Sequence, residues 1–292
     1  MVLQGTILTS FRRFVDGNLA CVADVPLLMT AKDKFYRAYM DFFEIAERKR
    51  RWNLFDDVPW DKLSSDSNTE ERAIRIETYC AEEMYLPDYT AAGNELLRGV
   101  FGLAWFQNAW SYEESRHGLV FREYLIRSGL RTQAQFDRFE TDVFSRSWQV
   151  PFATRRQMSC YGALQESATY LAYRAQKDRA EVENDATLEA IFFLVSRDEA
   201  AHAGFYREMI AIEMDDDRIG TLADLAYVIA NFKMPGDGLI PNYHANLRIG
   251  GGGISARLFL TRAVLPMLKQ LGTSRDELKS ATAAALLLRA AS

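Results

Sequence analysis

Glu114-Ser-Arg-His117 and Glu199-Ala-Ala-His202 share one pattern, a glutamate followed three residues later by a histidine. Each lies within a long stretch whose apolar residues recur at helical spacing. Side chains three residues apart lie on the same face of a helix, so each stretch directs one carboxylate and one imidazole toward the same point. The chain has 3 histidines, and two of them lie here. The sequence therefore predicts two helices that carry matching metal ligands.

Two further carboxylates are expected on neighbouring helices. Glu166 lies on the apolar face of a predicted helix over about 153–178. Glu82 and Glu83 lie on another, about 100° apart around the helix axis, so only one of them can point inward. We select Glu83 because it shares a face with Ile76 and Tyr79. Two Glu-x-x-His helices and two helices with one glutamate each form the ligand set of a dinuclear centre in a four-helix bundle.

The predicted metal ligands are Glu83, Glu114, His117, Glu166, Glu199 and His202. Buried carboxylates without cations are very costly, and two divalent ions would balance four of them. Four carboxylates and two imidazoles suit iron or manganese rather than metals that prefer thiolates. We expect two iron ions, Fe2+ in the resting reduced form, with manganese as the alternative. Such a centre could use O2 to abstract hydrogen from an unactivated C–H bond, behind an apolar wall that excludes water.

The composition is that of a globular protein. Of the 292 residues, 48% are hydrophobic and 26% are charged. The net charge of -5 argues against a general nucleic-acid binder. Neither a signal peptide nor an apolar run long enough to span a membrane is expected. Cys21, Cys80 and Cys160 form no C-x-x-C motif, which favours free thiols and a cytoplasmic location.

The apolar periodicity predicts an all-α protein with a single domain over residues 1–292. Residues 1–30 are expected to form an N-terminal arm, and residues 254–292 two C-terminal helices. Pro87 is expected to kink a helix over about 70–99 rather than to end it, with Thr69 as its N-cap. The other helices are expected over about 31–51, 101–128, 132–148, 153–178, 185–213 and 219–232, and residues 232–253 are expected to form a loop.

Over about residues 31–240, the chain resembles the soluble acyl-carrier-protein desaturases of the ferritin-like superfamily. Residues 82–89, with Glu-Glu and Leu-Pro-Asp-Tyr, resemble the Glu-Glu…Leu-Pro…Tyr segment of that family. Residues 113–118 resemble its Glu-Glu-Asn-Arg-His-Gly, and residues 165–169 its Gln-Glu-Arg-Ala-Thr. Asp198-Glu199…His202 resembles its Asp-Glu…Arg-His. The resemblance implies a ferritin-like four-helix bundle with additional helices.

The same resemblance implies a function: desaturation of an acyl chain carried on acyl carrier protein, dependent on O2 and on a ferredoxin-type electron donor, in a homodimer. It implies that Thr169 provides a hydroxyl beside the O2 site, although a helical threonine can instead bond to its own backbone. Asp198 would orient a ligand histidine. Trp52 would lie on the electron-entry route, or would simply pack over the bundle.

Acyl carrier protein is acidic, so docking would require a basic patch. The run Arg48, Lys49, Arg50 and Arg51 is one candidate, and Arg155-Arg156 is another. The alternative for the run is a solvated helix end whose cations complement the helix dipole.

Two departures from the family pattern keep other functions open. Ala201 stands where the family usually has arginine, and the segment between Glu83 and Glu114 is shorter than in the plant enzymes. One alternative is a related di-iron hydroxylase or N-oxygenase, although N-oxygenases carry extra histidines and only His244 remains here. Another is a non-catalytic ferritin-like metal or radical protein. The radical site of such a protein would be Tyr112, Tyr170 or Tyr206.

Overall fold

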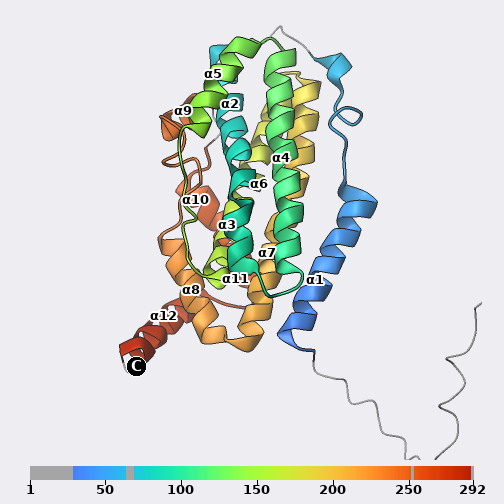
Figure 1. Ribbon diagram of the computed structural model, residues 1–292. Helices are drawn as coiled ribbons and strands as arrows, with labels where there is room; N and C mark the ends of the chain where they lie inside the picture. The colour runs from blue at the N-terminus through green and yellow to red at the C-terminus, as the bar shows by residue number, and fades with distance from the viewer. Residues whose placement is uncertain (1–28, 64–68, 251–252, 291–292) are drawn as a thin grey trace, which may run out of the picture.

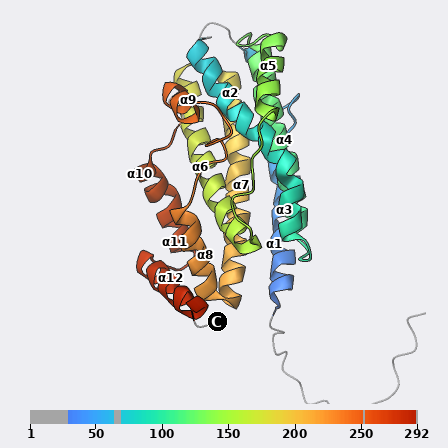
Figure 2. The same cartoon turned by 60° about the vertical axis from the view of Figure 1, so that its left-hand side comes forward.

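Four long helices form the centre of the molecule in the computed structural model, which describes residues 29–63, 69–250 and 253–290 (Figure 1). They are α2 (Glu70–Tyr85), α4 (Leu103–Arg127), α6 (Arg155–Val182) and α7 (Ala186–Asp216). In both views these helices run side by side, with α6 packed along α7 and α2 along α4 (Figures 1 and 2). The described residues contain no strand, and the predicted all-α class is confirmed.

Shorter helices surround this bundle. They are α1 (Ala31–Ile45), α3 (Thr90–Leu97), α5 (Gln133–Phe144), α8 (Arg218–Ala230), α9 (Tyr243–Gly250), α10 (Ala256–Phe259), α11 (Leu265–Gln270) and α12 (Arg275–Ala290). α1 packs against α7 and α4, and it continues as a π-helical turn over Ala46–Arg50. α9 packs against α2, on the opposite side of the bundle from α1 (Figure 1).

One end of the bundle is tied together by the turn between α6 and α7. Asn184 in this turn has a φ of 55°, a left-handed conformation that asparagine tolerates. Asp185 caps α7 by accepting a hydrogen bond of 2.8 Å from the Leu188 amide. The same buried carboxylate also accepts bonds from Arg72 of α2 at 3.0 Å and from the Tyr124 hydroxyl of α4 at 2.5 Å. A single capping residue therefore joins all four helices.

Two aromatic clusters fill the bundle on either side of its middle. Toward the α6–α7 turn, ring centroids of Tyr79, Phe121, Tyr173 and Phe192 lie 5.2–6.3 Å apart. Toward the other end, Phe106 packs on Phe205 with centroids 3.9 Å apart, and Phe42 and Tyr206 lie beside them. These rings keep water away from the polar residues that lie between the two clusters.

Two details of the predicted secondary structure were wrong. Pro87 does not simply kink one helix, because α2 ends at Tyr85 and a 3-10 turn, Leu86–Tyr89, separates it from α3. Proline lacks the amide hydrogen that an α-helix needs there. The expected loop over 232–253 contains α9. Thr69 caps α2 as predicted, accepting a 3.1 Å bond from the Arg72 amide.

The described residues include no helix that is long and apolar enough to cross a membrane. Cys80 and Cys160 are buried free thiols. Cys21 and residues 1–28 of the predicted N-terminal arm lie outside the described residues.

Candidate metal centre

The six predicted ligands come together in the middle of the bundle. Glu83 belongs to α2, Glu166 to α6, and the two Glu-x-x-His pairs to α4 and α7. Each of the six side chains belongs to a residue that is no more than 1% exposed. Imidazole and carboxylate atoms of these residues lie 3.1–3.6 Å apart between helices, because the helical spacing of each pair turns its polar atoms to the bundle axis.

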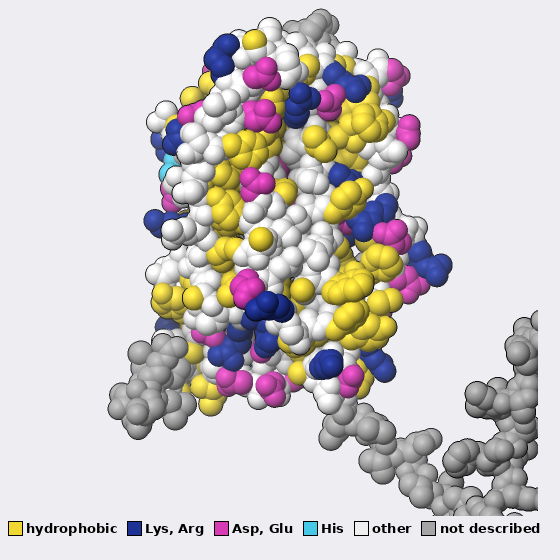
Figure 3. Space-filling view, viewed as in Figure 1, with side chains coloured by type: hydrophobic (Ala, Val, Ile, Leu, Met, Phe, Trp, Pro, Cys, Tyr) yellow, Lys and Arg dark blue, Asp and Glu magenta, His cyan; other side chains and the backbone are white. Residues whose placement is uncertain are grey.

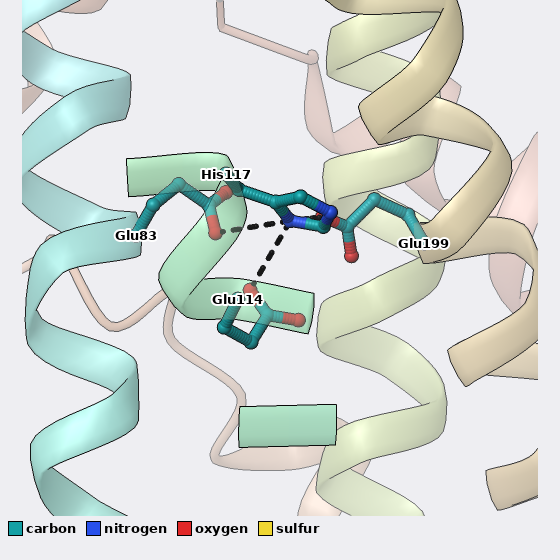
Figure 4. Close-up of side chains that lie close together, drawn as sticks. All are labelled: Glu83, Glu114, His117 and Glu199. Carbon is teal, nitrogen blue, oxygen red and sulfur yellow. Dashed lines mark ion pairs between the residues drawn. The ribbon is translucent and has the colours of Figure 1, made fainter. Parts of the chain in front are cut away.

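The six residues form two overlapping groups. One consists of Glu83, Glu114, His117 and Glu199, and in it one ligand atom from each residue lies within 4.8 Å of the others (Figure 4). The second, with the same property, consists of Glu114, Glu166, Glu199 and His202. Glu114 and Glu199 belong to both groups. The arrangement can therefore hold two metal ions, with these two carboxylates between them.

Each histidine is oriented by an acid from the opposite Glu-x-x-His helix. The outer nitrogen of His117, Nε2, lies 3.2 Å from Oδ2 of Asp198 on α7. In the same way, Nε2 of His202 lies 2.6 Å from Oε2 of Glu113 on α4. A ring nitrogen that donates to a carboxylate leaves the other nitrogen free to bind metal. In both rings this other nitrogen is Nδ1, 3.1–3.2 Å from a glutamate that belongs to both groups.

The six residues form a ligand layer across the middle of the bundle, and its unpaired polar atoms fit two metal ions. Buried oxygens of Glu83, Glu114, Glu166 and Glu199, and Nδ1 of both histidines, have no hydrogen-bond partner. Native proteins rarely leave such groups buried and unpaired, because each one costs its lost hydration. Six unpaired ligand groups around one point are explained by cations, and the oxygen-rich set suits iron or manganese.

The electrostatics of the layer point the same way. Burial, reinforced by the nearby Glu83 carboxylate, raises the pKa of Glu114 to about 8. Burial and the Glu114 carboxylate raise the pKa of Glu199 well above its usual range. Burial opposes a raised pKa of His117, but the nearby carboxylates of Asp198 and the ligand glutamates outweigh it and raise that pKa. Without metal, the layer therefore holds protons that metal ions would displace.

Trp52 and Asp198 form a continuous chain with His117. The indole Nε1 of Trp52 donates to Asp198 Oδ2 at 2.8 Å, the same oxygen that contacts His117. The Trp52 and His117 rings are nearly parallel, 7° apart, with centroids 6.5 Å from each other. The guanidinium of Arg116 covers the Trp52 ring at 4.2 Å from its centroid. A hydrogen-bonded path therefore leads from the buried indole of Trp52 to the ligand layer.

The basic run that ends α1 does not lie wholly in solvent, as a docking patch would require. Arg48 and Lys49 are exposed, but Arg50 is 5% exposed and pairs with both Glu113 and Asp198. Arg51 also pairs with Glu113, at 2.5 Å. Arg50 is therefore wrong as a docking residue, because two buried carboxylates from α4 and α7 hold it inside the bundle.

Thr169 lies beside the layer and lines a cavity of about 400 Å³ between α2, α6 and α9. Its hydroxyl donates to the Gln165 carbonyl at 3.1 Å, the backbone bond that is the alternative to a role beside O2. Tyr173, which also lines the cavity, donates a hydrogen bond to Glu83. The cavity thus comes within one side chain of the ligand layer.

Glu82 points into this cavity and away from the metal ligands. Its Oε1 accepts bonds from the Gly236 amide at 3.0 Å and from the Tyr243 hydroxyl at 2.9 Å. Burial raises its pKa to about 7. Neither Glu113 nor this role of Glu82 was anticipated. The signal for Glu113 was its position, since it precedes Glu114 as Asp198 precedes Glu199.

Comparison with known proteins identifies the family of this chain. A family model described as fatty acid desaturase matches residues 61–247. The Mycobacterium tuberculosis protein named for acyl-[acyl-carrier-protein] desaturase activity, DesA1, is 25% identical over 245 residues, which cover 75% of this chain and 70% of that protein. Acyl-[acyl-carrier-protein] desaturase 6, chloroplastic, of Oryza sativa is 30% identical over 147 residues, 46% of this chain and 35% of that protein.

The fold also has a solved counterpart. The crystal structure of a protein described as the acyl-ACP desaturase DesA2 of Mycobacterium tuberculosis H37Rv matches with a TM-score of 0.59 and 17% identity. The match covers 84% of this chain and 99% of that one. At this identity the likeness concerns the fold alone, and it confirms the predicted ferritin-like helical bundle.

Proposed function

Since the chain belongs to the fatty acid desaturase family, we propose that it introduces a double bond into an acyl chain carried on acyl carrier protein. The proposed centre is two iron ions held by Glu83, Glu114, His117, Glu166, Glu199 and His202. The observation that carries this proposal is the largely apolar cavity that reaches the ligand layer through Tyr173. When bound, the iron ions would supply O2 activation and hydrogen abstraction from an unactivated C–H bond.

The residues of this chain would position the substrate and exclude water. The aromatic clusters on either side of the ligand layer would exclude water, and the cavity beside Tyr79 and Tyr173 offers the substrate an apolar approach. The Thr169 hydroxyl lies on this approach. By releasing its bond to the Gln165 carbonyl, it would become free to relay a proton. Glu113 and Asp198 hold both imidazoles with Nδ1 toward the metal.

The mouth of the cavity supports a docking surface for the carrier protein beside α9. His244 and Arg248 line the mouth and are exposed, and Arg257 follows two residues after Ser255, which also lines it. The remaining exposed residues of the expected patch, Arg48 and Lys49, belong to the π-helical turn that follows α1. In both views α1 lies across the bundle from α9 (Figures 1 and 2). A carrier docked there would present its acyl chain on the wrong side.

The other candidate patch is occupied within the chain. Arg155 pairs with Glu213, and Arg156 pairs with Asp217 and Asp224. Arg48 and Lys49 precede Trp52 by four and three residues in the chain, and the path through Asp198 to His117 begins at Trp52. Both are exposed, and Arg48 pairs only with the exposed Glu44 among the described residues. We therefore assign them to the docking of an acidic, ferredoxin-type electron donor, whose approach they would steer.

Product analysis tests the proposal. The iron-loaded protein, reduced by a ferredoxin system, would be supplied with acyl carrier protein that bears saturated acyl chains of different lengths. The acyl chains would then be released and analysed by mass spectrometry. We expect O2 consumption and an alkene with at least one chain length. A product that is only hydroxylated would contradict desaturation and favour an oxygenase. A tyrosyl radical signal with no turnover would favour the non-catalytic alternative.

A further inference from the structure

Arg50 connects the two histidine ligands on the side that faces away from the metal layer. Its Nη1 lies 2.7 Å from Glu113 Oε2 and 2.6 Å from Asp198 Oδ1, and its Nη2 lies 3.0 Å from Glu113 Oε1. These two carboxylates are the ones that accept hydrogen bonds from His202 and His117. One guanidinium thus holds both orienting acids at once.

Arg50 neutralises two buried negative charges. Glu113 and Asp198 are both 1% exposed, so each negative charge needs a partner. Arg51 supplies a second cation to Glu113, but the only arginine that pairs with Asp198 among the described residues is Arg50. Guanidinium is suited to this position because its planar fork can bond two carboxylates in fixed directions.

Arg50 borders a groove, and small residues of α7 form one wall of it. A groove of about 670 Å³ between α1 and α7 is lined by Arg50, Ala201 and Gly204. Position 201 directly precedes the ligand His202, and it is where the resembling family usually has arginine. A methyl group there leaves room beside His202 and supplies no charge. Glu113 and Asp198 instead share a cation from the π-helical turn after α1, which carries Arg50.

We propose that Arg50 is the positioning residue of both ligand histidines, and that it replaces the arginine missing at position 201. This inference rests on the proposed dinuclear centre but not on its substrate. Arg50 fixes Glu113 and Asp198, and these fix the two imidazoles with Nδ1 inward. It also ties the end of α1, and hence the adjoining Trp52, to the ligand layer.

Three variants test this role: Arg50→Met, Arg50→Lys and the double variant Arg50→Met with Ala201→Arg. Arg75→Met is the matched control, because Arg75 is also buried, with 2% of its surface exposed, and pairs with Glu183 at the end of the bundle. The measurements are the melting temperature of the metal-free protein and the rate at which iron is lost to a chelator. Neither depends on the substrate, so a failed desaturase assay does not affect them.

We expect Arg50→Met to lose iron about 10- to 100-fold faster than the unaltered protein, as removal of an orienting partner does elsewhere. Arg75→Met should lower the melting temperature but retain iron normally. In the double variant, Ala201→Arg should restore most of the iron retention that Arg50→Met loses. Arg50→Lys, which keeps the charge but not the fork, should be intermediate, and it carries the test if Arg50→Met does not fold.

Three results would overturn the inference. The first is normal iron retention in Arg50→Met, or in Arg50→Lys if only that variant folds. The second is equal loss of iron from Arg75→Met, which would reduce Arg50 to a general structural role. The third is a double variant that loses iron as fast as Arg50→Met, which would show that position 201 is no substitute.

Discussion

At the scale of single residues, the centre is built from pairs that cross between helices. Asp198 of α7 orients His117 of α4, and Glu113 of α4 orients His202 of α7. The ligands could be predicted from the sequence because helical spacing alone brings glutamate and histidine to one face. Helical spacing does not reveal the partner acid of each histidine, because it comes from a helix more than 80 residues away along the chain. Asp198 was expected only from the family resemblance, and Glu113 was not expected.

Removing either orienting acid should weaken the hold on iron. We expect Glu113→Gln and Asp198→Asn each to lower iron affinity about 10- to 100-fold, because the imidazole loses a charged acceptor. Trp52→Phe should retain iron but be reduced more slowly by the donor, since it loses only the indole bond to Asp198. Chelator competition and stopped-flow reduction measure the two effects. Loss of iron from Trp52→Phe would contradict the separation of roles.

Iron binding should release protons. Since the pKa of Glu114 is raised to about 8, this carboxyl is mostly protonated at neutral pH in the metal-free protein. A metal ion must displace that proton, so apparent iron affinity should rise as the pH increases from about 6 to 8. Calorimetric titration in buffers of different ionisation enthalpy would count the protons. An affinity that does not change with pH would contradict a protonated ligand layer.

At the scale of elements, the long helices could be predicted from apolar periodicity. The short helices could not, because their formation depends on contacts with other elements. α9 was read as a loop because its sequence is short and lies between prolines and glycines. Its Tyr243 is held by Glu82 of α2, a contact that local sequence does not reveal. The burial of Arg50 escaped prediction for the same reason, since its partners belong to α4 and α7.

The end of α6 should show a specific dependence on pH. Burial favours a higher pKa for Glu183, but hydrogen bonds from Arg75 and Arg179 outweigh burial and lower that pKa to about 2. A carboxyl whose pKa is lower in the folded state stabilises that state above its unfolded pKa of about 4.3, and this stabilisation is lost as the pH falls toward 2.

Glu183→Gln should therefore lower the melting temperature by roughly 3–6 °C at pH 7, for a partly exposed ion-pair network worth about 1–2 kcal/mol. Below about pH 4 the difference from the unaltered protein should narrow. Melting curves across this pH range give the comparison. A difference that stays constant with pH would mean that the charge of Glu183 does not contribute.

At the scale of the whole molecule, one face exposes an unusual number of aromatic side chains. Tyr36, Met40 and Phe43 of α1 lie beside Phe101 and Trp105, and each of the five is 38–55% exposed. Tyr36 and Phe101 have ring centroids 5.2 Å apart, and Phe101 and Trp105 5.1 Å. Figure 3 shows this hydrophobic patch at the lower right, over α1 and the start of α4. Patches of this kind mark interaction surfaces.

We propose that this patch is the interface of the expected homodimer. The protein should then have twice the chain mass of 33.3 kDa in light scattering. Trp105→Glu should give a monomer with unchanged helical content, because it places a charge in the interface core. Val182→Glu, at an 81% exposed position at the end of α6, is the matched control and should leave the dimer intact. A Trp105→Glu dimer would rule this interface out.

The fold class and the six converging side chains were the parts of this molecule that its sequence predicted best, since both follow from helical periodicity. The contacts that join these side chains across the bundle do not follow from helical periodicity. Mössbauer spectroscopy of the protein loaded with 57Fe and oxidised tests the centre most directly. With Glu114 and Glu199 shared between the two metal positions, it should show two irons per chain as one magnetically coupled pair. A single iron per chain, or two uncoupled irons, would contradict a carboxylate-bridged dinuclear centre.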